Sequence, residues 1–378
     1  MKIRIGQVGI SGYGVIHFEQ VMRLVESGRA DFCAAAVINP DQVPGQLAAL
    51  KRLGTRIYSS AEAMFEAERG KLDLVCIPTG IASHESMTVQ ALESGANVLV
   101  EKPAAGSVAA VRRMMDAERK SGKFAAVGFQ HIYAREVQFI KNLLVTGRLG
   151  AVRKAFCKGT WPRGDQYYSR NNWAGRRFAA DGTPVFDSPV NNAFAHYLNL
   201  ELFFSGVRFR ESARAVSVEG MLLRARPEIE TFDTCALHFK TENRVDIYTF
   251  LTHSTDVNRN PAIRIECERG AVYWCADHGW NIRSQDGAVL HSGCVEEPRG
   301  CMFLDVADRL EGEPVFLCPL SVALEHTNCM ELLSGTLTPV PVNAVRRETD
   351  GVYVLKNVAQ VFDECFLNGT LPAQGEIR

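Results

Sequence analysis

Residues 9–14 read Gly-Ile-Ser-Gly-Tyr-Gly, and they connect a short apolar stretch, residues 3–10, to a helical pattern over residues 15–27. A glycine-rich turn between a strand and a helix allows the backbone to approach a pyrophosphate, whose charge is stabilised at the helix N-terminus. Gly9 and Gly14 match the outer glycines of the dinucleotide pattern G-x-G-x-x-G. The turn therefore predicts a nucleotide site, and a tight turn without a ligand is the alternative.

The middle of this turn departs from the pattern, because Ser11 takes the second glycine position and Gly12 stands beside it. The surrounding sequence still favours the nucleotide site. Up to residue 128, apolar strand patterns alternate with helical ones, and the predicted strands cover residues 3–10, 32–38, 56–58, 72–77, 98–101 and 124–127. This alternation predicts a parallel, doubly wound sheet, which binds ligands beyond the carboxyl ends of its strands.

Three further strand ends would lie at the same edge of this sheet. The second strand ends at Asn39, where an acidic residue would bind a ribose hydroxyl and a nearby arginine would favour NADP. Asn39 does neither, and Asp41 is equally a turn or helix-cap residue, so the choice between NAD and NADP stays open. The strand over 72–77 stops at Pro78-Thr79, and residues 98–101 lead to Lys102, which a following proline holds extended.

After Gly128 the pattern changes from alternating strands and helices to a run of strands. A polar and aromatic stretch over residues 159–185 is long enough to suggest a functional loop, and an apolar helix is predicted over residues 193–204. Successive strands are predicted over residues 212–223, 231–239, 245–251, 263–267 and 271–275, and helices return near residues 302–310, 320–333 and 354–366. We expect a dinucleotide-binding domain over residues 1–128 and a substrate-binding and oligomerisation domain over residues 129–378, whose C-terminal helices could pack back on the first.

The composition excludes several classes of partner. The chain is 46% hydrophobic and 22% charged with a net charge of -1, which gives no reason to expect nucleic acid or an anionic membrane. No apolar run is long enough to cross a bilayer, and the N-terminus shows no secretion signal. Eleven cysteines without any Cys-x-x-Cys pair predict reduced thiols and no metal site. We therefore expect a cytoplasmic protein.

Several motifs together resemble the Gfo/Idh/MocA oxidoreductases, which include glucose–fructose oxidoreductase-like and inositol dehydrogenase-like enzymes. They are the glycine turn, Ile77-Pro78-Thr79, His84, Glu101-Lys102-Pro103, Gly128-Phe129-Gln130, Trp161-x-Arg163, Tyr167-Tyr168, Trp173-Ala174-Gly175-Arg176 and His196. The resemblance covers most of the chain and is weakest past residue 210. It implies an α/β fold: a Rossmann domain, then an α/β domain with a large, mainly antiparallel open sheet that often forms the subunit interface.

The resemblance also implies hydride transfer between NAD or NADP and a hydroxyl carbon of a sugar, polyol or sugar derivative. The cofactor contacts that it implies come from Gly9, Ser11, Gly12, Tyr13, Gly14, Asn39, Pro78, Thr79, His84, Glu101, Lys102 and Gln130. The substrate contacts that it implies come from Trp161, Arg163, Tyr168, Asn191, Asn192 and His196. We expect a homodimer or homotetramer through the C-terminal sheet.

Oxidation of an alcohol removes a hydride from carbon and a proton from oxygen. The ammonium of Lys102 would contact this oxygen and lower the pKa of the hydroxyl. His196 would act as the general base, since histidine titrates near neutrality. The family often places aspartates four residues before and three residues after this histidine, where the present chain has Asn192 and Asn199. On a helix Asn192 and His196 would share a face, but an asparagine cannot stabilise an imidazolium charge.

Other functions stay open at this stage. An enzyme with tightly held NAD(H) could epimerise a sugar or cleave a glycoside by a redox-assisted route. A non-catalytic protein that senses a dinucleotide or a sugar is favoured by the lost aspartates, and the retained Lys102 and His196 speak against it. His196 could also be a buried core histidine, and Lys102 a solvated turn residue. The aromatic and arginine side chains of residues 159–185 suit sugar stacking and carboxylate or phosphate binding, or else packing and a subunit contact.

Overall fold

The structure is a computed structural model that describes residues 2–377. The chain folds into two compact units. The first unit combines residues up to 133 with residues 297–324, and the second combines residues 134–296 with the remainder from residue 325. Within the described residues, no helix has the length and apolar character that crossing a membrane would require.

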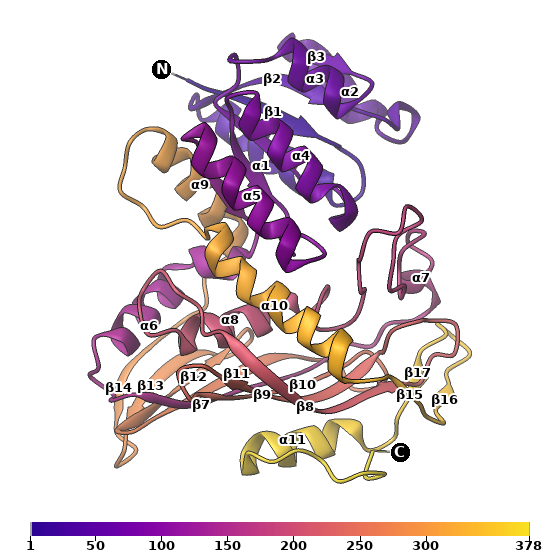
Figure 1. The fold of residues 1–378 in the computed structure, drawn as a ribbon, viewed down its shortest axis with the longest axis vertical. Helices are drawn as coiled ribbons and strands as arrows, with labels where there is room; N and C mark the ends of the chain where they lie inside the picture. Colours follow the sequence, from indigo (N-terminus) through magenta and orange to yellow (C-terminus); the bar gives the residue numbers. More distant parts are fainter. Residues whose placement is uncertain (1, 378) are drawn as a thin grey trace. The chain divides into compact units, whose positions relative to one another are not determined.

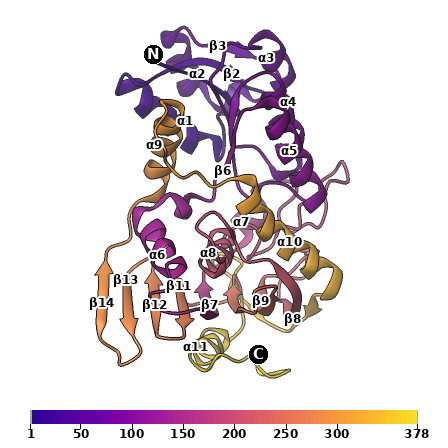
Figure 2. The ribbon, with the colours of Figure 1, turned by 60° about the vertical axis from the view of Figure 1, so that its left-hand side comes forward.

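The first unit is built on a six-stranded parallel sheet in the order β3-β2-β1-β4-β5-β6 (Figures 1 and 2). The strands are β1 (Ile3–Val8), β2 (Ala30–Ala36), β3 (Arg56–Tyr58), β4 (Leu74–Ile77), β5 (Asn97–Val100) and β6 (Ala125–Val127). The helices are α1 (Gly14–Glu26), η1 (Pro40–Gln42), α2 (Pro44–Leu53), α3 (Ala61–Ala67), α4 (Ile81–Glu93), α5 (Val108–Ser121), η2 (Gln130–Tyr133) and α9 (Pro298–Leu310). The predicted doubly wound parallel sheet is confirmed, and its order reverses between β1 and β4, where such sheets bind ligands.

Local sequence signals set the ends of several helices in this unit. The side chains of Ser60 and Ser107 accept hydrogen bonds from backbone N–H groups in the first turns of α3 and α5. Helix α9 joins the unit from a distant part of the sequence. Arg29, which follows α1, forms ion pairs with Asp308 and Glu311 at the end of α9.

The second unit contains a nine-stranded sheet in the order β14-β13-β12-β11-β7-β10-β9-β8-β15. Its strands are β7 (Val152–Thr160), β8 (Ala215–Arg224), β9 (Thr234–Thr241), β10 (Asp246–Thr252), β11 (Arg259–Cys267), β12 (Gly270–Cys275), β13 (Gly279–Ser284), β14 (Val289–Gly293) and β15 (Val340–Pro341). Only the β10–β7 and β15–β8 pairs of this sheet are parallel, which confirms the large, mainly antiparallel sheet. The other elements are α6 (Arg135–Val145), α7 (Asp165–Tyr168), α8 (Ala195–Ser205), α11 (Val358–Asn368) and the hairpin β16 (Val345–Arg346) and β17 (Tyr353–Val354). Helix α10 (Leu320–Thr336) begins in the first unit and continues in the second.

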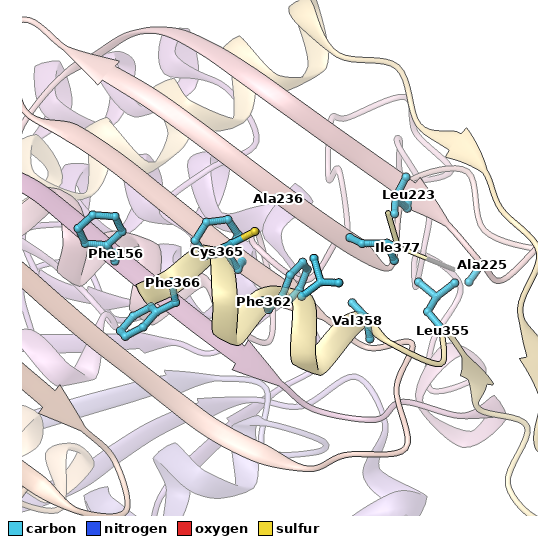
Figure 3. Packing of buried hydrophobic residues seen from close by; sticks show 12 residues of the cluster. Phe156, Leu223, Ala225, Ala236, Leu355, Val358, Phe362, Cys365, Phe366 and Ile377 are labelled. Atoms are coloured by element: carbon cyan, nitrogen blue, oxygen red, sulfur yellow. The ribbon is translucent and has the colours of Figure 1, made fainter. Parts of the chain in front are cut away.

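Helices α8 and α11 cover opposite faces of this sheet (Figures 1 and 3). On β10, the Thr249 hydroxyl faces α8 and donates a hydrogen bond to Glu201 at 2.6 Å. The next residue, Phe250, packs with Phe362 of α11, and their ring centroids lie 5.7 Å apart. Because side chains alternate along a strand, successive residues of β10 point to opposite faces of the sheet. One set packs in the layer under α8 and the other in the layer under α11.

Truncation of Phe362 tests the layer beneath α11. This side chain is 1% exposed within a cluster of buried apolar residues, so we expect Phe362→Ala to lower the free energy of unfolding by about 3–5 kcal/mol. The measurement is chemical denaturation followed by circular dichroism. Leu367→Ala on the same helix is the control, because Leu367 is 66% exposed and its loss should change stability by no more than about 0.5 kcal/mol. Equal effects of the two substitutions would contradict the packing of α11 on the sheet.

Candidate active site

The glycine turn after β1 has a geometry that larger side chains would prevent. Gly9 and Gly12 adopt positive φ angles of 82° and 53°. A Cβ atom on Gly14, the first residue of α1, would lie 2.5 Å from the carbonyl oxygen of Gly9. No atom lies within 4 Å of a Cβ built on Gly12. The turn therefore brings its own backbone together and leaves the Gly12 position open, which fits a pyrophosphate at the start of α1.

A buried glutamine holds the two ends of this turn. The Nε2 atom of Gln7 donates hydrogen bonds to the carbonyl oxygens of Gly9 and Gly14, both at 2.8 Å. Sequence reasoning missed Gln7, and the available signal was a polar residue near the end of the strand, directly before the glycine turn. The structure also places Ser11 and the 43%-exposed Tyr13 in this turn.

The ends of β2 and β4 flank the turn. Built Cβ atoms on Gly9 and Gly14 would lie 3.9 Å from Thr79 Cγ2 and 3.6 Å from Pro78 Cγ. The predicted residues Gly9, Gly14, Pro78 and Thr79 thus meet at the point where the strand order reverses. Asn39 immediately precedes η1, beyond the end of β2.

Glu101 follows β5 and links three parts of the first unit. One carboxylate oxygen lies 2.9 Å from Nε2 of His17 on α1, and the other accepts a hydrogen bond from the backbone N–H of Lys102 at 3.0 Å. Burial opposes ionisation of Glu101, but the bond to His17 and the charges of His17 and Lys102 outweigh it and hold the pKa below its ordinary range. A Cβ on Gly128 would lie 2.7 Å from the Glu101 carboxylate, so glycine is required there. Glu101 therefore fixes the backbone of the half-buried Lys102.

His84 is enclosed by backbone rather than open to a ligand. Its Nδ1 lies 2.8 Å from the carbonyl oxygen of Pro103, and its Nε2 lies 3.0 Å from that of Thr79. Burial lowers the pKa of His84, and the hydrogen bonds to the carbonyl oxygens of Pro103 and Thr79 act in the opposite direction. His84 thus connects the chain after β4 to the chain after Lys102. Gln130, in η2, is also buried.

Gly14→Ala tests the glycine turn. The added methyl group must displace the Gly9 carbonyl, so we expect the dissociation constant for NADH, measured by fluorescence titration, to rise at least ~10-fold through loss of the close backbone approach. Gly45→Ala is the control, because Gly45 lies in α2 with no atom within 4 Å of its built Cβ. Unchanged NADH binding by Gly14→Ala would exclude this turn as the pyrophosphate site.

In the second unit, three aromatic rings stack between β7, β10 and α8. The rings of Trp161 and Phe194 lie 4.4 Å apart at 20°, and those of Phe194 and His253 lie 5.2 Å apart at 21°. Phe194 immediately precedes α8, so the stack also fixes the start of the helix that carries His196. His253, which follows β10, was not predicted, because a single histidine after a strand gives no signal of its distant partners.

A carboxylate that sequence reasoning also missed organises the loop before α8. Asp187 is 4% exposed and accepts hydrogen bonds from the backbone N–H of Gly175 at 2.7 Å and from Nδ2 of Asn192 at 2.8 Å. The guanidinium of Arg170 lies 3.2 Å from both carboxylate oxygens. The preceding residue, Phe186, has a φ of 43°, an uncommon conformation for a residue with a side chain. Position 192 is an asparagine and not an aspartate, but its amide is hydrogen-bonded to the carboxylate of Asp187.

The predicted substrate residues differ in their surroundings. Asn192 lies in a turn before α8 and not on the helix, so its predicted helical i to i+4 relation with His196 was wrong. His196 lies in the first turn of α8 and is 9% exposed. Asn191 is 4% exposed and donates a hydrogen bond to the carbonyl oxygen of Val185 at 2.8 Å, so it supports the loop. The guanidinium of Arg226 lies over the ring of Tyr168, and its central carbon is 4.7 Å from the ring centroid.

The tautomer of His253 follows from its partner. Nδ1 lies 2.8 Å from the carbonyl oxygen of Trp161, which can only accept, so Nδ1 carries the proton and Nε2 presents a lone pair. Burial, opposed by this bond and assisted by the charges of Arg163 and Arg170, lowers the pKa of His253 from 6.5 to about 3. His253 is therefore neutral and too weakly basic to act as a general base near pH 7.

This pKa shift predicts a pH-dependent stability. Below pH 6.5 the unfolded chain binds a proton that the folded His253 does not, so stability is lost as the pH falls from 6.5 toward 3. Between pH 7 and pH 5 this residue should account for ~2 kcal/mol of lost unfolding free energy. His253→Asn keeps a donor for the Trp161 carbonyl and should remove that part of the slope in urea unfolding. An identical slope in both proteins would show that His253 is protonated in the folded state.

Comparison with known proteins finds a family that the first unit resembles. Residues 6–129 match the model of an oxidoreductase family with an NAD-binding Rossmann fold, called Gfo/Idh/MocA. Residues 6–129 are therefore similar to the NAD-binding part of the Gfo/Idh/MocA oxidoreductases. The matched residues form most of the first unit, and the model describes an NAD-binding Rossmann fold.

Proteins similar to this chain include named dehydrogenases. Inositol 2-dehydrogenase of Klebsiella pneumoniae (strain 342) is 24% identical over 272 residues, which are 71% of this chain and 71% of that protein. D-glucoside 3-dehydrogenase of Escherichia coli (strain K12) is 32% identical over 124 residues, which are 33% of this chain and 35% of that protein. The match to inositol 2-dehydrogenase of Pseudomonas fluorescens spans 49% of that relative, so some of these matches cover about half of the relative's length.

Solved structures share the fold over most of the chain. The WlbA dehydrogenase from Bordetella pertussis, solved with NADH and UDP-GlcNAcA, has a TM-score of 0.71 at 20% identity, covering 89% of this chain and 96% of that one. Aldose-aldose oxidoreductase from Caulobacter crescentus, solved with glycerol, has a TM-score of 0.69 at 18% identity, covering 89% and 97%. At these identities the likeness establishes the fold.

Proposed function

We propose that this protein is a dehydrogenase that transfers a hydride between NAD and a hydroxyl carbon of a sugar, polyol or sugar derivative. The observation that carries the proposal is the glycine turn packed against Pro78-Thr79 at the point where the order of the parallel strands reverses. The dehydrogenase names of the family relatives support the reaction class. When bound, the nicotinamide would accept or donate the hydride.

The chain's own residues would hold the cofactor by its phosphates and ribose. Ser11, Gly12 and Tyr13, which lie in the turn before α1, would surround the pyrophosphate and bind it with their backbone N–H groups at the start of the helix. Asn39 offers an amide to the ribose and carries no charge that would repel or attract a 2′-phosphate. We propose NAD because the matched family model describes an NAD-binding domain, and NADP stays an outcome of the cofactor titration.

Lys102 and His196 have separate roles in the proposed reaction. The Lys102 ammonium would contact the reacting oxygen, and Glu101 and His84 would act as positioning residues that fix the backbone on either side of it. His196 would take the proton from that oxygen. Asn192 would bind a substrate hydroxyl with its amide oxygen, since its Nδ2 is already bonded to Asp187. Trp161, Arg163 and Tyr168 complete the proposed substrate contacts.

We further propose a cytoplasmic homodimer or homotetramer that assembles through the second sheet. Within residues 2–377 none of the eleven cysteines forms a disulfide, which suits a reducing compartment. Helix α11 covers one face of the sheet, whereas the edge strand β14 exposes Val289 and Leu290, at 52% and 48%. An exposed apolar edge of this kind is a candidate contact between subunits.

Lys102→Met tests the proposed reaction. We expect kcat to fall at least ~100-fold, because the ammonium that polarises the hydroxyl is removed, while the dissociation constant for NADH changes less than about threefold. The measurements are NAD reduction with a panel of sugars, polyols and sugar acids, and NADH fluorescence titration. Lys120→Met removes the same charge at an exposed position of α5 and should leave both values unchanged.

The same experiments separate the alternatives. Unchanged turnover in Lys102→Met would exclude this lysine from the chemistry. A purified protein that carries stoichiometric nicotinamide resistant to dialysis would favour sugar epimerisation or glycoside cleavage with a retained cofactor. Binding of NADH without turnover of any compound would favour a sensor, and failure to bind NADH or NADPH would reject both enzymes.

A further inference from the structure

Arg163 differs from three arginines that surround α7. Arg170 faces the carboxylate of Asp187, and both Arg226 and Arg346 form ion pairs with Asp165. Within residues 2–377, by contrast, the side chain of Arg163 makes no hydrogen bond or ion pair, and its Nε is enclosed without an acceptor. Arginine keeps its charge at any ordinary pH, so Arg163 carries a positive charge that no carboxylate partner neutralises.

Aromatic rings hold this guanidinium in place. Its central carbon lies 5.6 Å from the ring centroid of Trp161 and 5.2 Å from that of Tyr167. The backbone N–H of Arg163 donates a hydrogen bond to the carbonyl oxygen of His253 at 3.1 Å. A planar guanidinium restrained in this way loses little freedom when it binds a carboxylate or phosphate through two parallel hydrogen bonds.

The nearby acids are already committed to other partners. Asp187 accepts bonds from Gly175 and Asn192 and faces Arg170. His253 is neutral and therefore provides no negative charge to balance that of Arg163. The positive charge of Arg163 therefore has no counter-ion among residues 2–377, and a bound anion would provide one.

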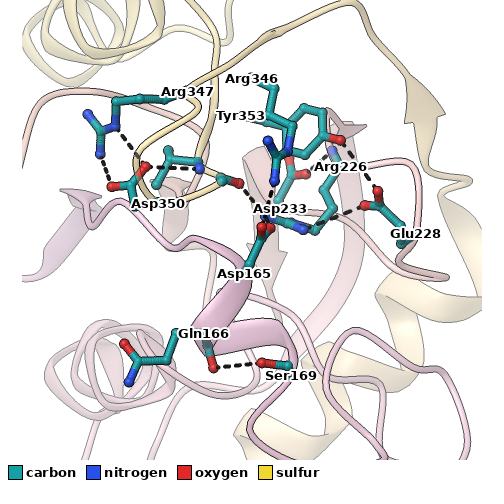
Figure 4. Close-up of polar contacts among 12 residues, drawn as sticks. Asp165, Gln166, Ser169, Arg226, Glu228, Asp233, Arg346, Arg347, Asp350 and Tyr353 are labelled. Carbon is teal, nitrogen blue, oxygen red and sulfur yellow. Dashed lines mark hydrogen bonds and ion pairs between the residues drawn. The ribbon is translucent and has the colours of Figure 1, made fainter.

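Residues of the C-terminal hairpin contact the start of α7 (Figure 4). This helix carries Tyr167, whose ring lies beneath Arg163. Asp165, the first residue of α7, accepts hydrogen bonds from Arg226 at 2.9 Å and from Arg346 at 2.6 Å. Its backbone N–H donates to the carbonyl oxygen of Asp350 at 3.0 Å, and a Cβ on Gly164 would lie 2.0 Å from that oxygen. These contacts clamp the short helix that carries Tyr167, so the position of the Arg163 stack does not depend on a mobile loop.

We propose that Arg163 binds an anionic group of the substrate, a carboxylate or a phosphate, so that the substrate is a sugar acid or a sugar phosphate. This inference rests on the proposed function, whose substrate class it narrows. A neutral polyol would leave the half-buried guanidinium without a counter-ion, whereas an anion would satisfy it and would also be attracted over a longer range.

Arg163→Gln is the direct test. Melting temperatures of the NADH complex would be measured against increasing inorganic phosphate, glucuronate, glucose 6-phosphate and glucose, at constant ionic strength set with chloride. For the wild-type protein we expect at least one anion to raise the melting temperature at concentrations where glucose does not. The apparent affinity for that anion should fall at least ~10-fold in Arg163→Gln and less in Arg163→Lys, which keeps the charge but loses the planar fork.

The control is Arg214→Gln, which removes an exposed arginine paired with Glu242 and gives the same change in net charge. It should respond to anions as the wild-type protein does. Stronger protection by glucose 6-phosphate and phosphate than by glucuronate would identify the ligand as a phosphate, and the reverse order a carboxylate. Equal protection of the wild-type protein and Arg163→Gln, or no protection by any anion, would overturn the inference. Failure of the wild-type protein to bind NADH would instead overturn the proposed function.

Discussion

The approach of Gly14 to the carbonyl of Gly9 is the constraint on which the cofactor end of the molecule depends. At a separation that excludes even one methyl group, α1 starts directly against the end of β1, and its first N–H groups, from Gly14 to Ile16, donate to the carbonyl oxygens of Ser11, Gly12 and Tyr13 in the turn. Pro78 and Thr79 then pack against the turn, and His84 ties the chain after Thr79 to Pro103. The close spacing of the two glycines therefore helps to determine where Lys102 lies, through the contacts of Pro78, Thr79 and His84.

The sequence was sufficient to predict the strands of the parallel sheet and the residues at their ends, because buried strands carry continuous apolar runs and the turn carries glycines. The mainly antiparallel sheet was also predicted, but β13 and β14 were not, since β14 is exposed along its whole length and has no apolar pattern. The predicted loop over residues 159–185 contains the single-turn helix α7, which is too short for a periodic signal.

The side chains that organise the candidate site were harder to find, because their roles depend on distant partners. Gln7, Asp187 and His253 are ordinary residues in the sequence and become informative only through the atoms they meet. Asn192 is an example. Helical spacing predicted that it would pair with His196, but it lies in a turn and its amide is hydrogen-bonded to Asp187.

The division of the first unit between two stretches of sequence has a consequence for the order in which the protein can fold. Chains are made from the N-terminus, and domains usually fold as they emerge from the ribosome. All six parallel strands are complete early, but His17, which contacts Glu101, packs its ring against Phe303 of α9 at 5.0 Å. Helix α9 is synthesised only after the whole of β7 to β14. The residues that hold the Lys102 backbone therefore reach their final packing late, when most of the second sheet has already been made.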